Sequence, residues 1–439
     1  MNDDFRRQTL LSWGAMAFLA SLFLPFPQGG KVLLSELFAP LMLWQCWNQR
    51  KRLGKLCLRE RPCLAFAALW MLLATVDHFL RGHGSLYDLA VFAYMGLIFL
   101  FLRLTPLPSP KASFRCGAAL LAILWGGWAL AKALPVQGTC LEGLLYFDGH
   151  FATLEPNALV TRYQFLFPNP NLLGGAYILP VLLCLPWLRP WFAAASSGKR
   201  GACLLLGALA FLPLLATASK MSVMTLGLLT GGLAMSLPSH RRLAAALALT
   251  ITLAFGTLCL TTVFFRTYPA VSQSPWVDFQ HRGNYSVHQE IYGRIFLASS
   301  WREKLLGHNA AQLRQLYPGH AREDRIREIL KPYGFEKETN LYATFMDPHC
   351  EYLNLLSFFG IPALLAVVAF LLRLAAQCAK NEEYAHALLI VGLLFAFFWE
   401  DVASKRFLWA ALGIVAARLP HPLDSPGDGA PGHGYIYPL

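Results

Sequence analysis

Charged residues are scarce in this 439-residue chain. Asp, Glu, Lys and Arg together make up 14% of the sequence, whereas apolar residues make up 56%. An average soluble domain is about 25% charged, so this composition excludes an ordinary soluble globular protein. The chain is therefore expected to be an integral membrane protein.

Cysteine pairs at metal-ligand spacing are also lacking. None of the ten Cys residues stands two to four positions from another, which excludes a zinc site of the usual pattern, and no disulfide framework is indicated. Cys140 and Cys350 alone are expected outside the cytoplasm, where a bridge between them is one possibility. No metal and no cofactor is expected.

Long apolar runs are what the chain has in abundance. Windows of about 19 residues predict an all-α polytopic protein with twelve transmembrane helices and one long polar stretch between the ninth and tenth. The expected spans are residues 9–27, 31–47, 62–80, 86–103, 114–134, 172–188, 202–218, 221–237, 243–264, 351–372, 384–399 and 403–419.

The distribution of basic residues predicts the orientation of the chain in the membrane. Most Lys and Arg of the short connections fall on one side of the spans, which predicts that both ends are cytoplasmic and that the long loop lies outside. The first apolar run lacks a small-residue cleavage pattern, so it is expected to remain as helix 1. The formal charge of +12 is explained by anionic lipid without nucleic acid.

Four regions follow from this topology. We expect transmembrane helices 1–9 in residues 1–264, a large, partly helical periplasmic loop in 265–350, helices 10–12 in 351–419 and a disordered cytoplasmic tail in 420–439. A second, smaller outer loop is expected in residues 135–170.

Three polar clusters border the expected outer face. In Asn169-Pro170-Asn171, the proline predicts an extended approach to a helix whose first turn the Asn amides could cap, or where they could bind a sugar hydroxyl or a phosphate. Lys220, in the turn Thr217-Ala218-Ser219-Lys220, is either a ligand or a snorkelling lysine. His349 precedes a helix in which Tyr352 recurs on the same face, and it is either a functional or a capping residue.

Together these clusters resemble the O-antigen ligase family, the membrane glycosyltransferases with the Wzy_C signature. The similarity lies in the order of degenerate motifs across about residues 160 to 375. They are Asn169-Pro170-Asn171, Thr217-Ala218-Ser219-Lys220, Gly293-Arg294 with Trp301 and Leu305-Leu306-Gly307, and His349-Cys350-Glu351-Tyr352-Leu353 with Gly360. Lys220 stands where the family has Arg, and Cys350 stands where it has Asn.

The resemblance implies a fold and a reaction. Members have a GT-C-like arrangement with the large loop between helices 9 and 10. They transfer a glycan from undecaprenyl diphosphate to lipid A-core, without a metal, at the periplasmic face of the bacterial inner membrane. The expected partners are therefore the lipid-linked glycan donor, the lipid A-core acceptor and membrane lipid, but not nucleic acid.

The same resemblance suggests roles for individual residues. A departing diphosphate needs cations, and an attacking hydroxyl needs a base with a pKa near 6.5. We expect His349 to be the base and Arg294 the foremost cation, with Glu290 or Asp347 orienting the histidine. An alternative for Arg294 is a salt bridge to Glu290, one helical turn earlier. Further candidates for substrate binding are Lys220, Arg266, Arg162, Asn169, Asn171, Glu290 and Tyr352.

Other functions stay open at this point. An O-antigen polymerase or a protein O-oligosaccharyltransferase would use the same donor with a different acceptor. A secondary transporter would instead use intramembrane charges as ion sites, and its candidates are Glu36, Asp77, His78, Asp88, Glu400 and Asp401. No inverted pair of broken helices favours it.

Overall fold

The computed structural model describes residues 3–23, 34–55, 62–82, 86–105, 108–133, 146–149, 160–163, 170–210, 212–216, 283–331, 350–381, 383–396 and 406–419. Most of these residues are helical. The helices are α1 (Asp3–Ser21), η1 (Leu34–Phe38), α2 (Ala39–Asn48), α3 (Arg50–Lys55), α4 (Pro62–Leu80), α5 (Leu86–Leu104), α6 (Pro110–Ala133), α8 (Pro170–Ala176), α9 (Ile178–Ala194), α10 (Ser197–Ala210), α11 (Leu212–Ala216), α15 (Gly283–Ala298), α16 (Trp301–Leu306), α17 (Ala310–His320), α18 (Glu323–Leu330), α19 (Glu351–Lys380), α20 (Tyr384–Ala396) and α21 (Arg406–Arg418).

The expected spans fall on these helices wherever the structure describes them. Helix α4 begins and ends at the expected residues, whereas α19 starts as expected but continues to Lys380, because good helix formers follow its apolar stretch. Within the described ranges, three helices, α4, α6 and α19, are long and apolar enough to cross a membrane. The spans at 221–237 and 243–264 lie outside the described residues, and the total of twelve stays a prediction.

One short β-ribbon departs from the expected all-helical fold. Strands β1 (Tyr146–Gly149) and β2 (Val160–Tyr163) pair antiparallel, with Tyr146 opposite Tyr163. Both strands lie within the smaller outer loop expected at 135–170. Four-residue strands carry too weak a pattern to be read from sequence, and their pairing satisfies backbone groups that a loop would leave open.

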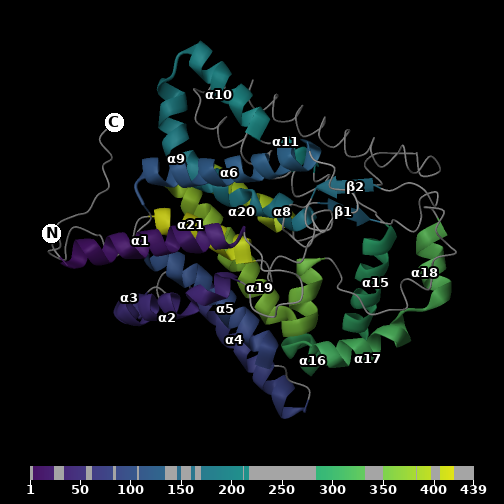
Figure 1. Cartoon of the computed structure of the whole chain (residues 1–439). Coiled ribbons are helices and arrows are strands. Elements are labelled where there is room, and N and C mark those ends of the chain that lie inside the picture. Colours follow the sequence, from purple (N-terminus) through teal and green to yellow (C-terminus); the bar gives the residue numbers. More distant parts are fainter. Residues whose placement is uncertain are drawn as a thin grey trace.

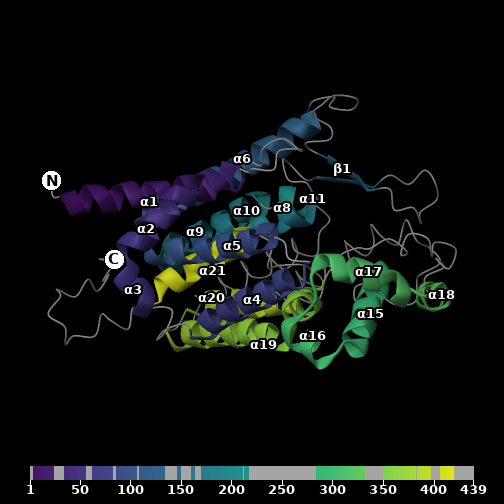
Figure 2. The same ribbon diagram turned by 90° about the horizontal axis from the view of Figure 1, so that it is seen from below.

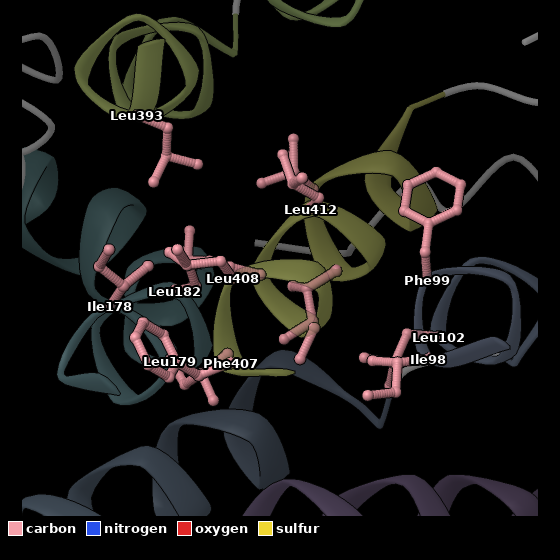
Figure 3. Close-up of a cluster of buried hydrophobic side chains, with 14 of the residues drawn as sticks. Ile98, Phe99, Leu102, Ile178, Leu179, Leu182, Leu393, Phe407, Leu408 and Leu412 are labelled. Carbon is pink, nitrogen blue, oxygen red and sulfur yellow. The ribbon is translucent and has the colours of Figure 1, made fainter. Parts of the chain in front are cut away.

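The core lies between the apolar helices. Helix α21 lies between α5 and α9, and the close-up in Figure 3 shows Phe407, Leu408 and Leu412 between the side chains of these two neighbours. Gly413 permits this close approach, because a Cβ there would lie 2.9 Å from the Cβ of Leu102. Small residues let membrane helices pack backbone to backbone, where packing is the main attraction between them.

The two ends of the bundle are different. Figures 1 and 2 show the basic helix α3 at one end, and the β-ribbon with α15, α17 and α18 at the opposite end. Helix α16 lies beside α4 and α19 in both views. Segments expected on opposite sides of a membrane therefore lie at opposite ends of the helices, and which end faces the cytoplasm stays a prediction.

Candidate active site and the docked loop

The helices of the long polar stretch begin at residues that the sequence itself marks. Ser300 caps α16 and Asn309 caps α17, and each forms a reciprocal capping box with the side chain three residues later, Glu303 and Gln312. Such boxes satisfy two backbone N–H groups that a helix start leaves open. The starts of α16 and α17 are thereby fixed by local hydrogen bonds.

Helices α15, α17 and α18 form a small core of their own. Its buried apolar members are Val287, Ile291, Tyr292, Ile295, Leu313, Tyr317 and Ile326. His288 is buried beside them, and its Nδ1 lies 2.6 Å from the Tyr317 hydroxyl. A packed core with a satisfied polar pair makes these helices a rigid support for the side chains on their surface.

Arg294 lies on the half-exposed surface of α15, in an ion-pair network. Its Nε and Nη2 donate to Glu290 Oε1 at 3.1 and 2.8 Å. Arg325 of α18 donates to the same oxygen at 2.8 Å and also pairs with Glu328. The hydrogen bonds to Glu290 and Glu328 raise the pKa of Arg325. The salt bridge considered as the alternative role of Arg294 is therefore present, and it holds the guanidinium in a fixed position.

The start of α19 packs against this loop core. Leu353 and Phe358 contact the core of α15, α17 and α18, while the Tyr352 hydroxyl donates to the Leu394 carbonyl of α20 at 2.6 Å. Glu351, the first residue of the helix, is buried. A helix N-terminus favours such a carboxylate through its dipole. The helix that carries Arg294 thus lies next to the helix that begins two residues after His349.

The turn after α16 crosses α19 at two glycines. Gly307 follows α16 and Gly360 lies inside α19, and both have φ of +77°. A Cβ at Gly360 would overlap the Leu305 carbonyl, and one at Gly307 would overlap the backbone of Phe358 and Phe359. Gly360 also interrupts the helical geometry of α19. Both positions require glycine, because of the positive φ and the lack of space.

Polar side chains of α4 hold the same turn. Asp77 is buried and pairs with Arg81 of its own segment and with Arg302 of α16. His78 Nε2 lies 3.3 Å from the Gly307 carbonyl, and Trp70 Nε1 donates to the Leu305 carbonyl at 3.0 Å. These contacts satisfy carbonyls at the end of α16 that have no partner within the helix.

His308, next to Gly307, is buried at the centre of the docked turn. Its backbone N–H donates to the Ser357 carbonyl at 2.6 Å, and its Nε2 lies 3.2 Å from Ser299 Oγ. Burial lowers the pKa of His308, although the Glu303 carboxylate 3.8 Å away opposes this shift. Burial alone would raise the pKa of Glu303, but hydrogen bonds from Ser300 lead the effects that lower it overall. The turn therefore contains a neutral imidazole beside a carboxylate.

The structure describes only some of the other predicted site residues. Arg162 lies in β2 opposite Phe147, and Asn171 is the second residue of α8, directly after Pro170. Proline is favoured at the first helical position, and the expected extended approach before it lies outside the described residues. His349, Lys220, Arg266, Asn169 and Asp347 lie outside the described residues, and so does Cys140. Their roles stay predictions.

Sequence reasoning missed the docking function of α4. Asp77 and His78 were weighed there as ion sites of a transporter, and Arg302 was not singled out. The signal was an Asp-His pair near the end of an apolar span, which predicts a buried partner but does not say which. Among the described residues, no group of three or more His, Cys, Asp or Glu side chains could hold a metal.

Comparisons with known proteins neither support nor contradict the resemblance. No family model matches this chain, and no curated protein matches it significantly.

Proposed function

We propose that this protein is a membrane glycosyltransferase of the O-antigen ligase type. It would move an O-antigen or related glycan from undecaprenyl diphosphate to lipid A-core, at the end of the bundle where α15, α17 and α18 lie. The expected site of action is the periplasmic face of the inner membrane. The observation that carries the proposal is the contact between two of the resembling motifs.

These two motifs are far apart in the sequence. The Leu305-Leu306-Gly307 turn lies in the polar loop, whereas Gly360 lies in the apolar helix α19. They meet with no room for a Cβ on either glycine. A chance similarity in sequence gives no reason for such a contact, whereas a shared architecture explains why each motif contains its glycine.

Arg294 is suited to stabilise a leaving diphosphate. Charge accumulates on the phosphate oxygens during the reaction, and a cation held in place beforehand stabilises that charge without reorganisation. Glu290 orients Arg294 on the rigid loop core. A guanidinium has five N–H donors, so its bonds to Glu290 occupy part of its capacity and leave donors for a phosphate.

His349 would act as the base. The acceptor hydroxyl must lose a proton as its oxygen forms a bond to the anomeric carbon, while the bond from that carbon to the diphosphate oxygen breaks. An imidazole can take that proton near neutral pH. The start of α19, packed through Leu353 on the core of α15, α17 and α18, offers a support on which such a base could be oriented toward Arg294.

Ion pairing weakens the transporter alternative. Asp77 pairs with Arg81 and Arg302, and Glu36 pairs with Arg406 at the start of α21. Carboxylates bound in this way already have cations, so a transported ion would have to displace an arginine. A role in holding segments together explains both pairs more simply.

The decisive experiment is deletion of the gene in its own host, followed by analysis of the surface lipopolysaccharide. Loss of a ligase leaves bare lipid A-core and accumulated lipid-linked polymer. Core carrying a single repeat would indicate a polymerase instead, and normal lipopolysaccharide with an unglycosylated protein would indicate a protein oligosaccharyltransferase. Unchanged glycans on every acceptor would refute the proposal, and solute uptake without a lipid donor would favour the transporter.

A further inference from the structure

The end of α15 and the neighbouring α16 expose large apolar side chains. Leu297 is 74% exposed, Trp301 is 77% exposed and Leu305 is 43% exposed. Single exposed apolar residues are common on proteins, but three of them within nine residues form a patch. The three recur at intervals of four residues, although the helix breaks between α15 and α16.

The contacts of α16 place this patch along the side of α4. Arg302 pairs with Asp77. The Gly307 carbonyl lies 3.3 Å from His78 Nε2, and Trp70 Nε1 donates to the Leu305 carbonyl. Trp70 is about 15 Å from Leu80 along the helix axis, at 1.5 Å per residue. Helix α4 is about 28 Å long at the same rise, close to the roughly 30 Å of a bilayer's hydrocarbon core. Because α4 can span the membrane, α16 flanks the half of α4 that ends at Leu80.

The patch continues an apolar surface on α4 itself. Phe66, Leu69, Leu73 and Leu80 are all more than 45% exposed. On a membrane-spanning helix, such side chains face lipid. The hydrogen bond from Trp70 to Leu305 joins this surface to α16. Lipid that covers α4 therefore reaches α16 as well.

Lys304 gives the patch the chemistry of a membrane boundary. Its ammonium lies 5.4 Å from the Trp301 ring centroid and 5.9 Å from that of Phe296. Tryptophan is enriched at the boundary between headgroups and acyl chains, and lysine can bury its stem while its charge stays among the headgroups. An aromatic ring with a cation on its face suits that level of the bilayer.

We propose that Leu297, Trp301 and Leu305, with Lys304, form an interfacial anchor that inserts the α16 turn into the outer leaflet beside α4. The partner is bilayer lipid of the outer leaflet, with Trp301 and the Lys304 ammonium at the level of the headgroups and Leu305, next to Trp70, deeper among the acyl chains. The anchor does not depend on glycan transfer. It explains why a segment of the polar loop exposes two leucines and a tryptophan.

The test uses the full-length protein in bilayers that contain brominated lipid, which quenches nearby tryptophan fluorescence. Subtracting the emission of Trp301→Phe from that of wild type isolates Trp301 from the other tryptophans. The Trp301 component should lose most of its intensity with bromines near the headgroups and less with bromines deep in the acyl chains. It should resist quenching by iodide in water.

A matched control places a tryptophan on a helix far from α4. Arg327 of α18 is exposed, and α18 lies away from α4 in both views of the molecule. In a Trp301→Phe background, the Arg327→Trp signal should be quenched by iodide and not by brominated lipid. A Trp301 component that iodide quenches would overturn the anchor. One that neither reagent quenches would also overturn it, because a protein surface or a second copy would then cover the patch.

Discussion

At the scale of single residues, Arg294 forms the salt bridge to Glu290 that was one of its two expected roles, and its role toward a diphosphate stays a prediction. Its helix, α15, contributes to the loop core that Leu353 and Phe358 of α19 contact. A guanidinium has five N–H donors, so those that do not bond to Glu290 can bind a phosphate. Structure and proposed chemistry are therefore compatible at this residue.

The first prediction concerns Arg294. Arg294→Ala should lower the glycan transfer rate by about two to three decades, because one fixed contact to the developing charge is lost. Arg294→Lys should retain part of the rate, since a point charge replaces a planar fork. The rate is measured with purified protein, lipid-linked glycan and lipid A-core. Arg327→Ala, which removes another exposed loop arginine, is the control, and wild-type activity of Arg294→Ala would exclude Arg294 from the site.

The second prediction concerns His349. If it is the base, His349→Ala should lose about two to four decades in rate while the lipid-linked donor still binds. Transfer by the wild type should also decline as pH falls through the pKa of the histidine, because an imidazolium cannot accept a proton. Both rate and donor binding are measured at matched expression. Near-normal turnover in a well-expressed His349→Ala protein would rule out this role.

The third prediction compares the loss of Asp77 with the loss of Arg302, the two partners of the ion pair between α4 and α16. Asp77→Asn should destabilise the protein by about 3 kcal/mol, because it leaves the half-buried Arg81 without its carboxylate. Arg302→Ala should cost about 1 kcal/mol or less, since the Arg302 side chain is 62% exposed. Thermal unfolding in detergent ranks the two variants. Equal shifts in the unfolding midpoint would mean that Arg81 does not share in the pair.

At the scale of elements, the contact between α16 and α19 depends on backbone geometry. Two glycines with positive φ let the end of one helix cross the middle of another. The interruption at Gly360 separates a first part of α19, which contacts both the loop core and the bundle core, from a second part that packs in the bundle core. Gly360 thus interrupts α19 and also leaves space for the backbone at the end of α16.

The fourth prediction tests this crossing. Gly360→Ala should open the docked turn, because the added methyl overlaps the Leu305 carbonyl and alanine disfavours φ of +77°. The loop between α15 and α18 should then be cleaved faster by a protease added to the outer face. Gly126→Ala in α6, where nothing lies within 4 Å of the added Cβ, is the control. Equal cleavage of both variants and wild type would contradict the crossing.

At the scale of the whole molecule, the loop and the bundle form one packed unit. Side chains from α4 and backbone atoms from α19 hold the α16 turn, and Phe358 contacts the cores of both the bundle and the loop. The α15, α17 and α18 helices are therefore fixed relative to the bundle. A change that releases the α16 turn should affect the stability of the whole protein.

The fifth prediction follows from the buried His308 in that turn. Its pKa is lowered from 6.5 in the folded state by burial, so the unfolded chain binds more protons below about pH 6.5. The contribution of His308 to the free energy of unfolding should therefore be fully present above that pH, and it should be lost as pH falls toward the pKa of the folded state. The groups around the ring are Glu303, His78, Arg81 and Ser299. Glu303 does not oppose this trend, because its own pKa is lowered from 4.5.

The measurement is the unfolding midpoint of wild type and His308→Gln between pH 7.5 and about pH 5, the range in which an ordinary histidine titrates. The wild-type midpoint should fall with pH, and the variant should show a smaller dependence. The comparison concerns the slopes, so a uniform loss of stability in the variant does not affect it. Equal slopes would show that His308 does not titrate on unfolding.

The sequence alone determined the class of the protein and the positions of many of its helices. Scarce charge and long apolar runs need no tertiary information, because the bilayer acts on each segment separately. The ends of α4 and the start of α19 were predicted for this reason. The capping boxes at Ser300 and Asn309 are likewise local patterns.

Only the tertiary structure decided which polar residues meet. Asp77 and Arg302 are far apart in the chain, and nothing in either segment specifies the other as its partner. The same holds for Gly307 and Gly360, whose glycines are needed only because two backbones cross there. Long-range contacts depend on the packing of the whole chain, whereas periodicity and capping depend on a few neighbouring residues.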